Sequence, residues 1–212
     1  MRKMPAYNFT FILLLTLFVL LVYNASAMAI KSVNKKETVK RFQSIYASYS
    51  NALLKTVAQM GGNTGCYYIS DGTRNHDFSN CDEFYKTFVS NLKVQKYCHG
   101  NALKDECIPV YESYTNKERC VGFSEEMLNE YDDAFVMPDG SNVIVYNVTK
   151  NDRRPIFAVD TNGFAKPNQA GEDLFSITII KNSNGAIYFH PNISHCLPVS
   201  KGGIEYINDV YK

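Results

Sequence analysis

The sequence predicts an α+β fold in which a long N-terminal helix, membrane-embedded in its first half and amphipathic in its second half, packs on an antiparallel β-meander stapled by disulfides. Three observations predict this fold class. Neither glycine nor proline occurs from Ala6 to Met60, short β-branched segments separated by turn signals fill the C-terminal part, and all six cysteines follow Met60.

The first half of the predicted helix is almost wholly apolar. No charged residue occurs between Lys3 and Lys31, and Phe9–Ile30 has about the 20 residues that a helix needs to cross a bilayer. The same segment also has the pattern of a secretory signal, because a basic start precedes it and Ala25–Ala27 offers a small-residue cleavage site. A retained anchor and a cleaved signal therefore both remain open.

The second half, from Glu37 to Met60, is amphipathic. Apolar side chains recur there at steps of three and four residues, which is the period of one helix face. Gly61 and Gly62 supply the end signal. We expect this face to cover the sheet; its residues are Val39, Phe42, Tyr46, Tyr49, Leu53, Val57 and Met60.

The chain is predicted to have two parts, a basic start with a hydrophobic signal or anchor helix (1–30) and a globular domain (31–212). The domain comprises the amphipathic helix (31–60), a mixed helix and loop region with cysteines (61–133) and the antiparallel sheet (134–212). In the mixed region, 82–94 has a helical pattern with Asn80 as its cap. The predicted strands are 66–69, 134–137, 142–148, 156–160, 174–180 and 186–189, with turns at 70–73, 138–141 and 182–185.

The cysteines predict disulfides and an oxidising compartment, because their number is even and they follow an export-like segment. They are Cys66, Cys81, Cys98, Cys107, Cys120 and Cys196. The short polar loop between Cys98 and Cys107 favours a bridge between these two, and the other pairings stay open. The net charge of +1, without a basic cluster, argues against a nucleic-acid partner.

This layout resembles a type IV pilin or pseudopilin. Phe9–Phe11 opens the apolar helix as in a prepilin, and a basic amphipathic stretch follows at 35–56. The C-terminal half is similar to pilin-like proteins in which a strand, an Asp-Gly turn and a strand precede a DxNGxxxPNxxGxDxF stretch; here these are Ala134–Tyr146 and Asp160–Phe175. Prepilins usually have a glycine before the first phenylalanine and a glutamate one turn later, where this chain has Asn8 and Leu13.

The resemblance implies a non-catalytic pilin-like envelope protein, a subunit or accessory component of a type IV pilus or type II secretion-type filament. It also implies two kinds of partner, the membrane through Phe9–Ile30 and like subunits through the N-terminal helix. The implied location is the bacterial cell envelope, as a single-pass inner-membrane protein with an exported C-terminal domain, in a filament or secreted. The alternative is a soluble secreted binding module released by signal peptidase after Ala27.

Four residues of one loop offer oxygen atoms that suit calcium: Asp160, Asn162, Asn168 and Asp173. Their spacing does not match an EF-hand, and Asp, Asn and Gly residues commonly bond their own backbone in tight loops. We therefore favour a self-bonded loop, with a weak calcium site as the other interpretation and no further cofactor. Gly163 and Gly171 are expected to adopt conformations that a Cβ would strain.

An enzyme is the third hypothesis and the least favoured. The chain has no GxSxG elbow and no glycine-rich phosphate loop. Histidines occur at His76, His99, His190 and His195, the last beside Cys196, and we interpret them as solvated loop residues.

Overall fold

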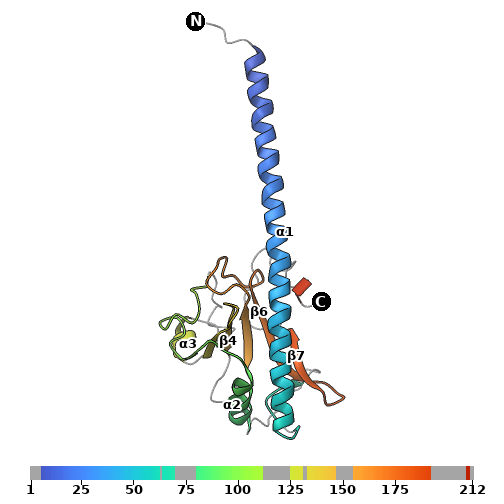
Figure 1. Ribbon diagram of the computed structural model, residues 1–212, viewed down its shortest axis with the longest axis vertical. Coiled ribbons are helices and arrows are strands. Elements are labelled where there is room, and N and C mark those ends of the chain that lie inside the picture. Colours follow the sequence, from blue (N-terminus) through green and yellow to red (C-terminus); the bar gives the residue numbers. More distant parts are fainter. Residues whose placement is uncertain are drawn as a thin grey trace. The chain divides into compact units, whose positions relative to one another are not determined.

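The computed structural model describes residues 6–62, 64–69, 80–111, 125–130, 133–146, 155–191 and 209–210. The chain divides into two units, Met1–Glu37 and Thr38–Lys212, and helix α1 (Ala6–Gln59) begins in the first and ends in the second. The other described helices are α2 (Cys81–Asn91) and α3 (Glu125–Glu130) (Figure 1). The strands are β1 (Tyr68–Ile69), β2 (Lys96–His99), β3 (Asp133–Val136), β4 (Asn142–Tyr146), β5 (Ile156–Asp160), β6 (Leu174–Lys181) and β7 (Ile187–Pro191).

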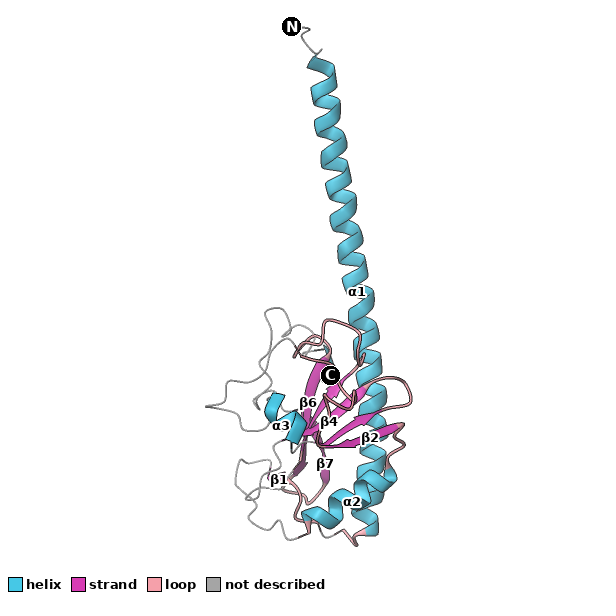
Figure 2. Cartoon of the chain, turned by 90° about the vertical axis from the view of Figure 1, so that its left-hand side faces the viewer, coloured by secondary structure: helices cyan, strands magenta, loops and turns pink. Residues whose placement is uncertain are grey.

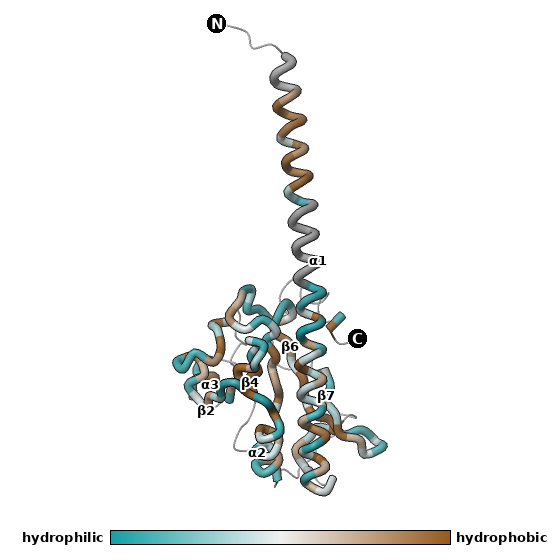
Figure 3. The backbone as a smooth tube through the Cα atoms, viewed as in Figure 1, coloured by the Kyte–Doolittle hydropathy of each residue, from teal (hydrophilic) through white to brown (hydrophobic). Residues whose placement is uncertain are grey.

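In the first unit, α1 exposes apolar side chains along a continuous stretch. Every side chain from Phe11 to Asn24 is exposed, and Figure 3 shows most of this stretch in the brown of hydrophobic residues. No helix in the described residues is both long and apolar enough to cross a membrane.

The predicted fold class is wrong in two respects. The sheet is mixed rather than an antiparallel meander, because β1 pairs with β6 in parallel, Tyr68 opposite Ile180. The prediction that the first half of the long helix is embedded in a membrane is also wrong, because none of the described helices is both long and apolar enough to span one. The seven-stranded sheet is the dominant element of the second unit.

The six strands β2 to β7 pair antiparallel in chain order (Figure 2). Ile180 of β6 pairs with both Tyr188 of β7 and Tyr68 of β1. β1 therefore lies on the edge of β6 that β5 also uses, beyond the end of β5. The length of β6 makes this double pairing possible.

The C-terminal part of α1 covers one face of the sheet, together with α2. The predicted apolar face is confirmed: Phe42, Tyr49 and Leu53 are buried, and the other four predicted positions are half-buried against the same core. The ring of Tyr49 lies 5.6 Å from that of Phe88 in α2 and 5.9 Å from that of Phe157 in β5, centroid to centroid. Edge-on and tilted aromatic contacts of this kind add stabilisation to the burial of the rings.

The helix ends where the sequence predicts. Gly61 and Gly62 have positive φ angles of 65° and 77°. The Gly62 N–H donates to the Val57 carbonyl at 2.8 Å and the Gly61 N–H donates to the Ala58 carbonyl at 3.1 Å. This is the bonding of a Schellman motif, which satisfies two of the last carbonyls of the helix.

The opposite face of the sheet is also covered, which the sequence pattern does not predict. Residues 100–111 and α3 pack there, and Ile108 and Leu128 are buried against Ile144 of β4 and Ala158 of β5. Strands buried on both faces lose the alternation of apolar and polar residues. This explains why β4 and β5 are buried at every position.

Two local predictions need correction. The helix predicted at 82–94 is α2 and ends at Asn91. The Asn80 side chain makes no capping hydrogen bond to α2; its Oδ1 accepts instead from the Gly65 N–H at 2.8 Å. Strand β2 lies in a segment for which no strand was predicted.

Candidate functional site

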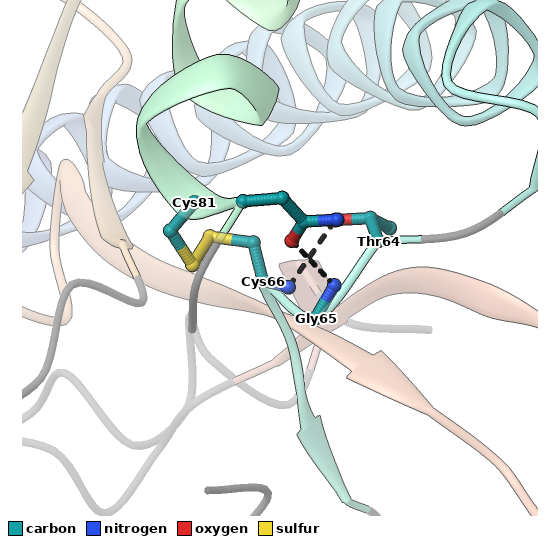
Figure 4. Close-up of a disulfide and its surroundings, with 5 residues drawn as sticks. Thr64, Gly65, Cys66 and Cys81 are labelled. Atoms are coloured by element: carbon teal, nitrogen blue, oxygen red, sulfur yellow. Dashed lines mark hydrogen bonds between the residues drawn. A yellow bond between two sulfur atoms is a disulfide. The ribbon is translucent and has the colours of Figure 1, made fainter. Parts of the chain in front are cut away.

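Two disulfides join cysteines of the described residues. The predicted bridge between Cys98 and Cys107 is confirmed, and Cys66 is bonded to Cys81 (Figure 4). No described cysteine is free. Disulfides persist in oxidising compartments, so the chain belongs in an extracellular or otherwise oxidising environment. Cys120 and Cys196 lie outside the described residues, so the prediction that these two cysteines are also oxidised stays a prediction.

The Cys66–Cys81 bridge fixes the start of α2. Figure 4 shows it beside two hydrogen bonds, one from the Gly65 N–H to Asn80 and one from the Cys66 N–H to Oγ1 of Thr64 at 3.2 Å. Cys66 and Cys81 are both buried in the core. The bridge thus ties the segment 64–69 to the first residue of α2.

The four residues predicted for a calcium site lie on the connection between β5 and β6. Asp160 is the last residue of β5, and Asp173 immediately precedes β6. Because these strands are antiparallel neighbours, the two carboxylates meet at one end of the pair. Both are buried, as is Asn168, while Asn162 is half-buried.

The Asp160 carboxylate accepts three hydrogen bonds from its own surroundings. Its Oδ1 accepts from the backbone N–H of Asn162 at 3.2 Å and of Gly163 at 2.9 Å. Its Oδ2 accepts from the Tyr111 hydroxyl at 3.0 Å. Tyr111 belongs to the segment that covers the second face of the sheet, so Asp160 ties that segment to the β5–β6 loop.

Asp173 orders the other end of the loop. Its Oδ2 accepts from the Asn168 N–H at 2.7 Å and its Oδ1 accepts from the Gln169 N–H at 2.6 Å. Asn168 is held at a positive φ of 52°, and its side-chain amide nitrogen, in the orientation that satisfies it, donates to the carbonyls of Ala165 and Gly163. Gly163 and Gly171 have φ angles of 62° and 84°, as predicted.

Burial sets the electrostatics of the two carboxyl groups. It raises the pKa of Asp160 well above its ordinary value, and the neighbouring Asp173 raises it further, while the hydrogen bonds from Tyr111 and the backbone act in the opposite direction. Burial also raises the pKa of Asp173, against the lowering effect of the Gln169 and Asn168 N–H groups. Both shifts make ionisation of these carboxyl groups less favourable in the folded chain than in water.

The carboxylates of Asp160 and Asp173 accept hydrogen bonds from backbone N–H groups of their own loop, as the self-bonded interpretation predicts. Among the described residues, no group of three or more His, Cys, Asp or Glu side chains is placed to hold a metal ion. The Asn162 side-chain oxygen is buried without a hydrogen bond, although its amide nitrogen donates to the Lys166 carbonyl at 3.2 Å. Calcium binding at this loop stays a prediction.

Two of the four histidines lie in described strands. His190 is exposed in β7, whereas His76 and His195 lie outside the described residues, as does Cys196. His99 is in β2 rather than a loop, and its Nδ1 lies 2.6 Å from Oδ1 of Asp133 in β3. The sequence gives no signal for Asp133, because only the strand register that puts it opposite His99 brings the two together.

Comparison with known proteins gives no relative. No family model, curated protein or solved structure matches the chain.

Proposed function

We propose that the protein is a non-catalytic, pilin-like component of the bacterial cell envelope, a subunit or accessory part of a type IV pilus or type II secretion-type filament. In this proposal the segment Phe9–Ile30 associates with the membrane and with like segments of other subunits. The second unit is the exported part, in keeping with its disulfides.

One observation carries the proposal: an apolar helix surface that is exposed in the described part of the chain. From Phe11 to Val22 the large hydrophobic side chains are each at least about half exposed, on every side of α1. Soluble monomers rarely expose apolar patches as large as this one, and larger patches are typical of sites that contact another protein or a membrane. We therefore expect this surface to be covered in the assembled protein. Like subunits or lipid would both supply a cover.

The second unit supports a structural role. Its amphipathic helix is locked to the sheet by the aromatic cluster around Tyr49 and by the Tyr46 hydroxyl, which donates to the Phe189 carbonyl at 2.6 Å. A helix that is fixed to a folded unit at one end and apolar at the other can present that unit at the surface of an assembly.

The mature N-terminus tests the proposal. A protein that begins at Phe9, or that is not cut, fits a pilin-like component, whereas a protein that begins at Met28 fits the secreted binding module. The variant Asn8→Gly restores the glycine that prepilins have before the first phenylalanine, and it should increase cleavage there. N-terminal sequencing that finds Met28 in most of the purified protein would remove the proposal.

Assembly has its own test. A photo-crosslinking residue in place of Val19 should give covalent multimers in intact cells, and the same residue in place of the exposed Lys40 should not. If neither crosslinking variant gives covalent multimers, the apolar surface does not contact like subunits, and the filament part of the proposal is contradicted.

A further inference from the structure

Two asparagines of the chain are followed directly by glycine, Asn162 before Gly163 and Asn184 before Gly185. In such a pair the backbone nitrogen of the glycine can attack the asparagine side chain, because no Cβ of the following residue hinders its approach. The reaction needs no enzyme, so the local structure decides whether it proceeds. The fold places the two pairs in opposite surroundings.

Asn184 and Gly185 lie at the tip of the β6–β7 hairpin, which projects from the sheet (Figure 1). Both residues are exposed. The backbone N–H of Asn184 donates to Oδ1 of Asn182 at 3.1 Å, but the Asn184 side chain has no hydrogen bond within the described part of the chain. A Cβ at Gly185 would meet no atom within 4 Å. The reacting groups are therefore open to solvent and free to approach each other.

One hydrogen bond restrains the attacking nitrogen at this tip. The Gly185 N–H donates to the Asn182 carbonyl at 3.0 Å and closes the turn. Exposed backbone hydrogen bonds with few buried contacts around them open locally at a low cost in free energy. Attack on the Asn184 side chain therefore needs the loss of a single exposed hydrogen bond.

Asn162 and Gly163 lie instead in the self-bonded loop between β5 and β6. Gly163 is buried, and its N–H donates to Oδ1 of Asp160 at 2.9 Å. The Asn162 side chain is held as well, since its nitrogen donates to the Lys166 carbonyl at 3.2 Å. The carbonyl oxygen of Gly140 also packs against Gly163. Attack at this site would have to break two hydrogen bonds, one of them to a buried carboxylate.

We propose that Asn184 is a site of spontaneous deamidation and that the fold protects Asn162 from the same reaction. The Gly185 nitrogen loses its proton to solvent and forms a bond to Cγ of Asn184. The bond from Cγ to the side-chain nitrogen breaks, and this nitrogen takes up a proton and leaves as ammonia. Water then opens one of the two C–N bonds of the succinimide ring, so residue 184 becomes aspartate or isoaspartate. The proposal is independent of filament assembly.

Both products change the tip of the hairpin. Each adds one negative charge, and isoaspartate also adds one carbon atom to the main chain between residues 184 and 185. The hydrogen bond from the Gly185 N–H to the Asn182 carbonyl cannot keep its geometry with that added atom. The pairing of Lys181 with Ile187 and the buried ring of Phe189 lie beyond the tip. The change is therefore confined to residues 182–186.

Ageing of the purified full chain in mildly alkaline buffer tests the proposal. Peptide mass spectrometry with fragment assignment detects the mass gain that accompanies the exchange of an amide for an acid. In the folded chain Asn184 should deamidate at least about tenfold faster than Asn162, the equivalent of one additional hydrogen bond at Asn162. In denaturant the two asparagines should deamidate at comparable rates, because glycine follows both.

Two variants complete the test. Gly185→Ala has room for its Cβ and should slow deamidation of Asn184 several-fold, because the Cβ hinders the attack. Ser183→Ala changes the same exposed turn but none of the reacting atoms, and it should leave the rate unchanged. Equal rates at Asn184 and Asn162 in the folded chain overturn the proposal, as does an unmodified Asn184 in a folded chain that reacts in denaturant. A rate that Gly185→Ala does not lower would also overturn it, because the nitrogen of residue 185 would then not be the attacking atom.

Discussion

Gly163 lies so close to the carbonyl oxygen of Gly140 that a Cβ at position 163 would overlap with it. The contact joins the turn after β5 to the turn between β3 and β4, two loops that are separate in the sequence. Gly163 also has a positive φ of 62°, which a residue with a Cβ adopts at a cost. Backbone approach and backbone conformation therefore both require glycine here.

The variant Gly163→Ala should lower the free energy of unfolding by at least about 2 kcal/mol, from strain and overlap together. Gly185→Ala is the matched control, because Gly185 has a φ of 83° but no atom near the added Cβ. This control should lower the free energy of unfolding only by the cost of a positive φ for alanine, about 1 kcal/mol. Urea unfolding of both variants measures the difference, and equal losses would contradict the close approach.

The helix face on the sheet gives a second prediction. Leu53 is 1% exposed in the core, so Leu53→Ala should cost about 2–5 kcal/mol. Lys40 lies on the exposed side of the same helix, and Lys40→Ala should cost little. Thermal melts of the two variants check this, and indistinguishable melting temperatures would show that the face is assigned wrongly.

The disulfides give a third prediction. Non-reducing mass spectrometry of the native protein should show a deficit of about two daltons for each bridge, with Cys66–Cys81 and Cys98–Cys107 among the linked peptides. Replacing both Cys98 and Cys107 by serine should cost about 2–5 kcal/mol. Alkylation of all six cysteines in freshly isolated folded protein would rule out an oxidising compartment.

Local patterns in the sequence predict part of this fold. The apolar residues Phe42, Tyr49 and Leu53 belong to a spacing of three and four residues, which predicts the buried helix face. The strand at 156–160 is predicted by its own apolar residues, and the turn after it by its glycine. What the sequence does not reveal depends on contacts between distant segments. The predicted strand at 66–69 is present as β1, but its parallel pairing with β6 is not apparent from the sequence, because it depends on the edge of β6 that extends beyond β5.

The same reasoning applies to the site residues. The bonds of Asp160 and Asp173 to the N–H groups of Asn162, Gly163, Asn168 and Gln169 are local, so the self-bonded loop is predictable. The partner Tyr111 is 49 residues from Asp160 along the chain, and only the cover on the second face of the sheet brings it there. The pair of His99 and Asp133 likewise needs the register of β2 on β3.

Calcium gives a fourth prediction. Because the carboxylate oxygens of Asp160 and Asp173 already accept backbone and tyrosine hydrogen bonds, we expect the melting temperature to be the same with calcium and with a chelator. A ligand that binds only the folded chain raises stability by mass action. A shift of several degrees on chelation, absent in Asp160→Asn, would establish an ion site and replace the self-bonded interpretation.

The fifth prediction concerns pH. The ordinary pKa of an aspartate is 3.8, and both carboxyls have raised values in the folded chain. Between the ordinary and the raised value the folded chain binds more protons than the unfolded chain, so the free energy of unfolding falls as pH rises. The contribution is fully present below the ordinary pKa and is lost as pH rises through the folded pKa.

Asp160→Asn should therefore reduce this fall and raise stability at neutral pH. The amide oxygen still accepts from the Asn162 and Gly163 N–H groups, and its nitrogen can donate to the Tyr111 hydroxyl. Asp173→Asn is the contrasting variant, because both oxygens of Asp173 accept from backbone N–H groups and an amide nitrogen cannot. It should cost about 1–3 kcal/mol at every pH. Urea unfolding across the acidic to neutral range separates the two, and a pH slope in Asp160→Asn as steep as in the wild type would mean that Asp160 is ionised in the folded chain.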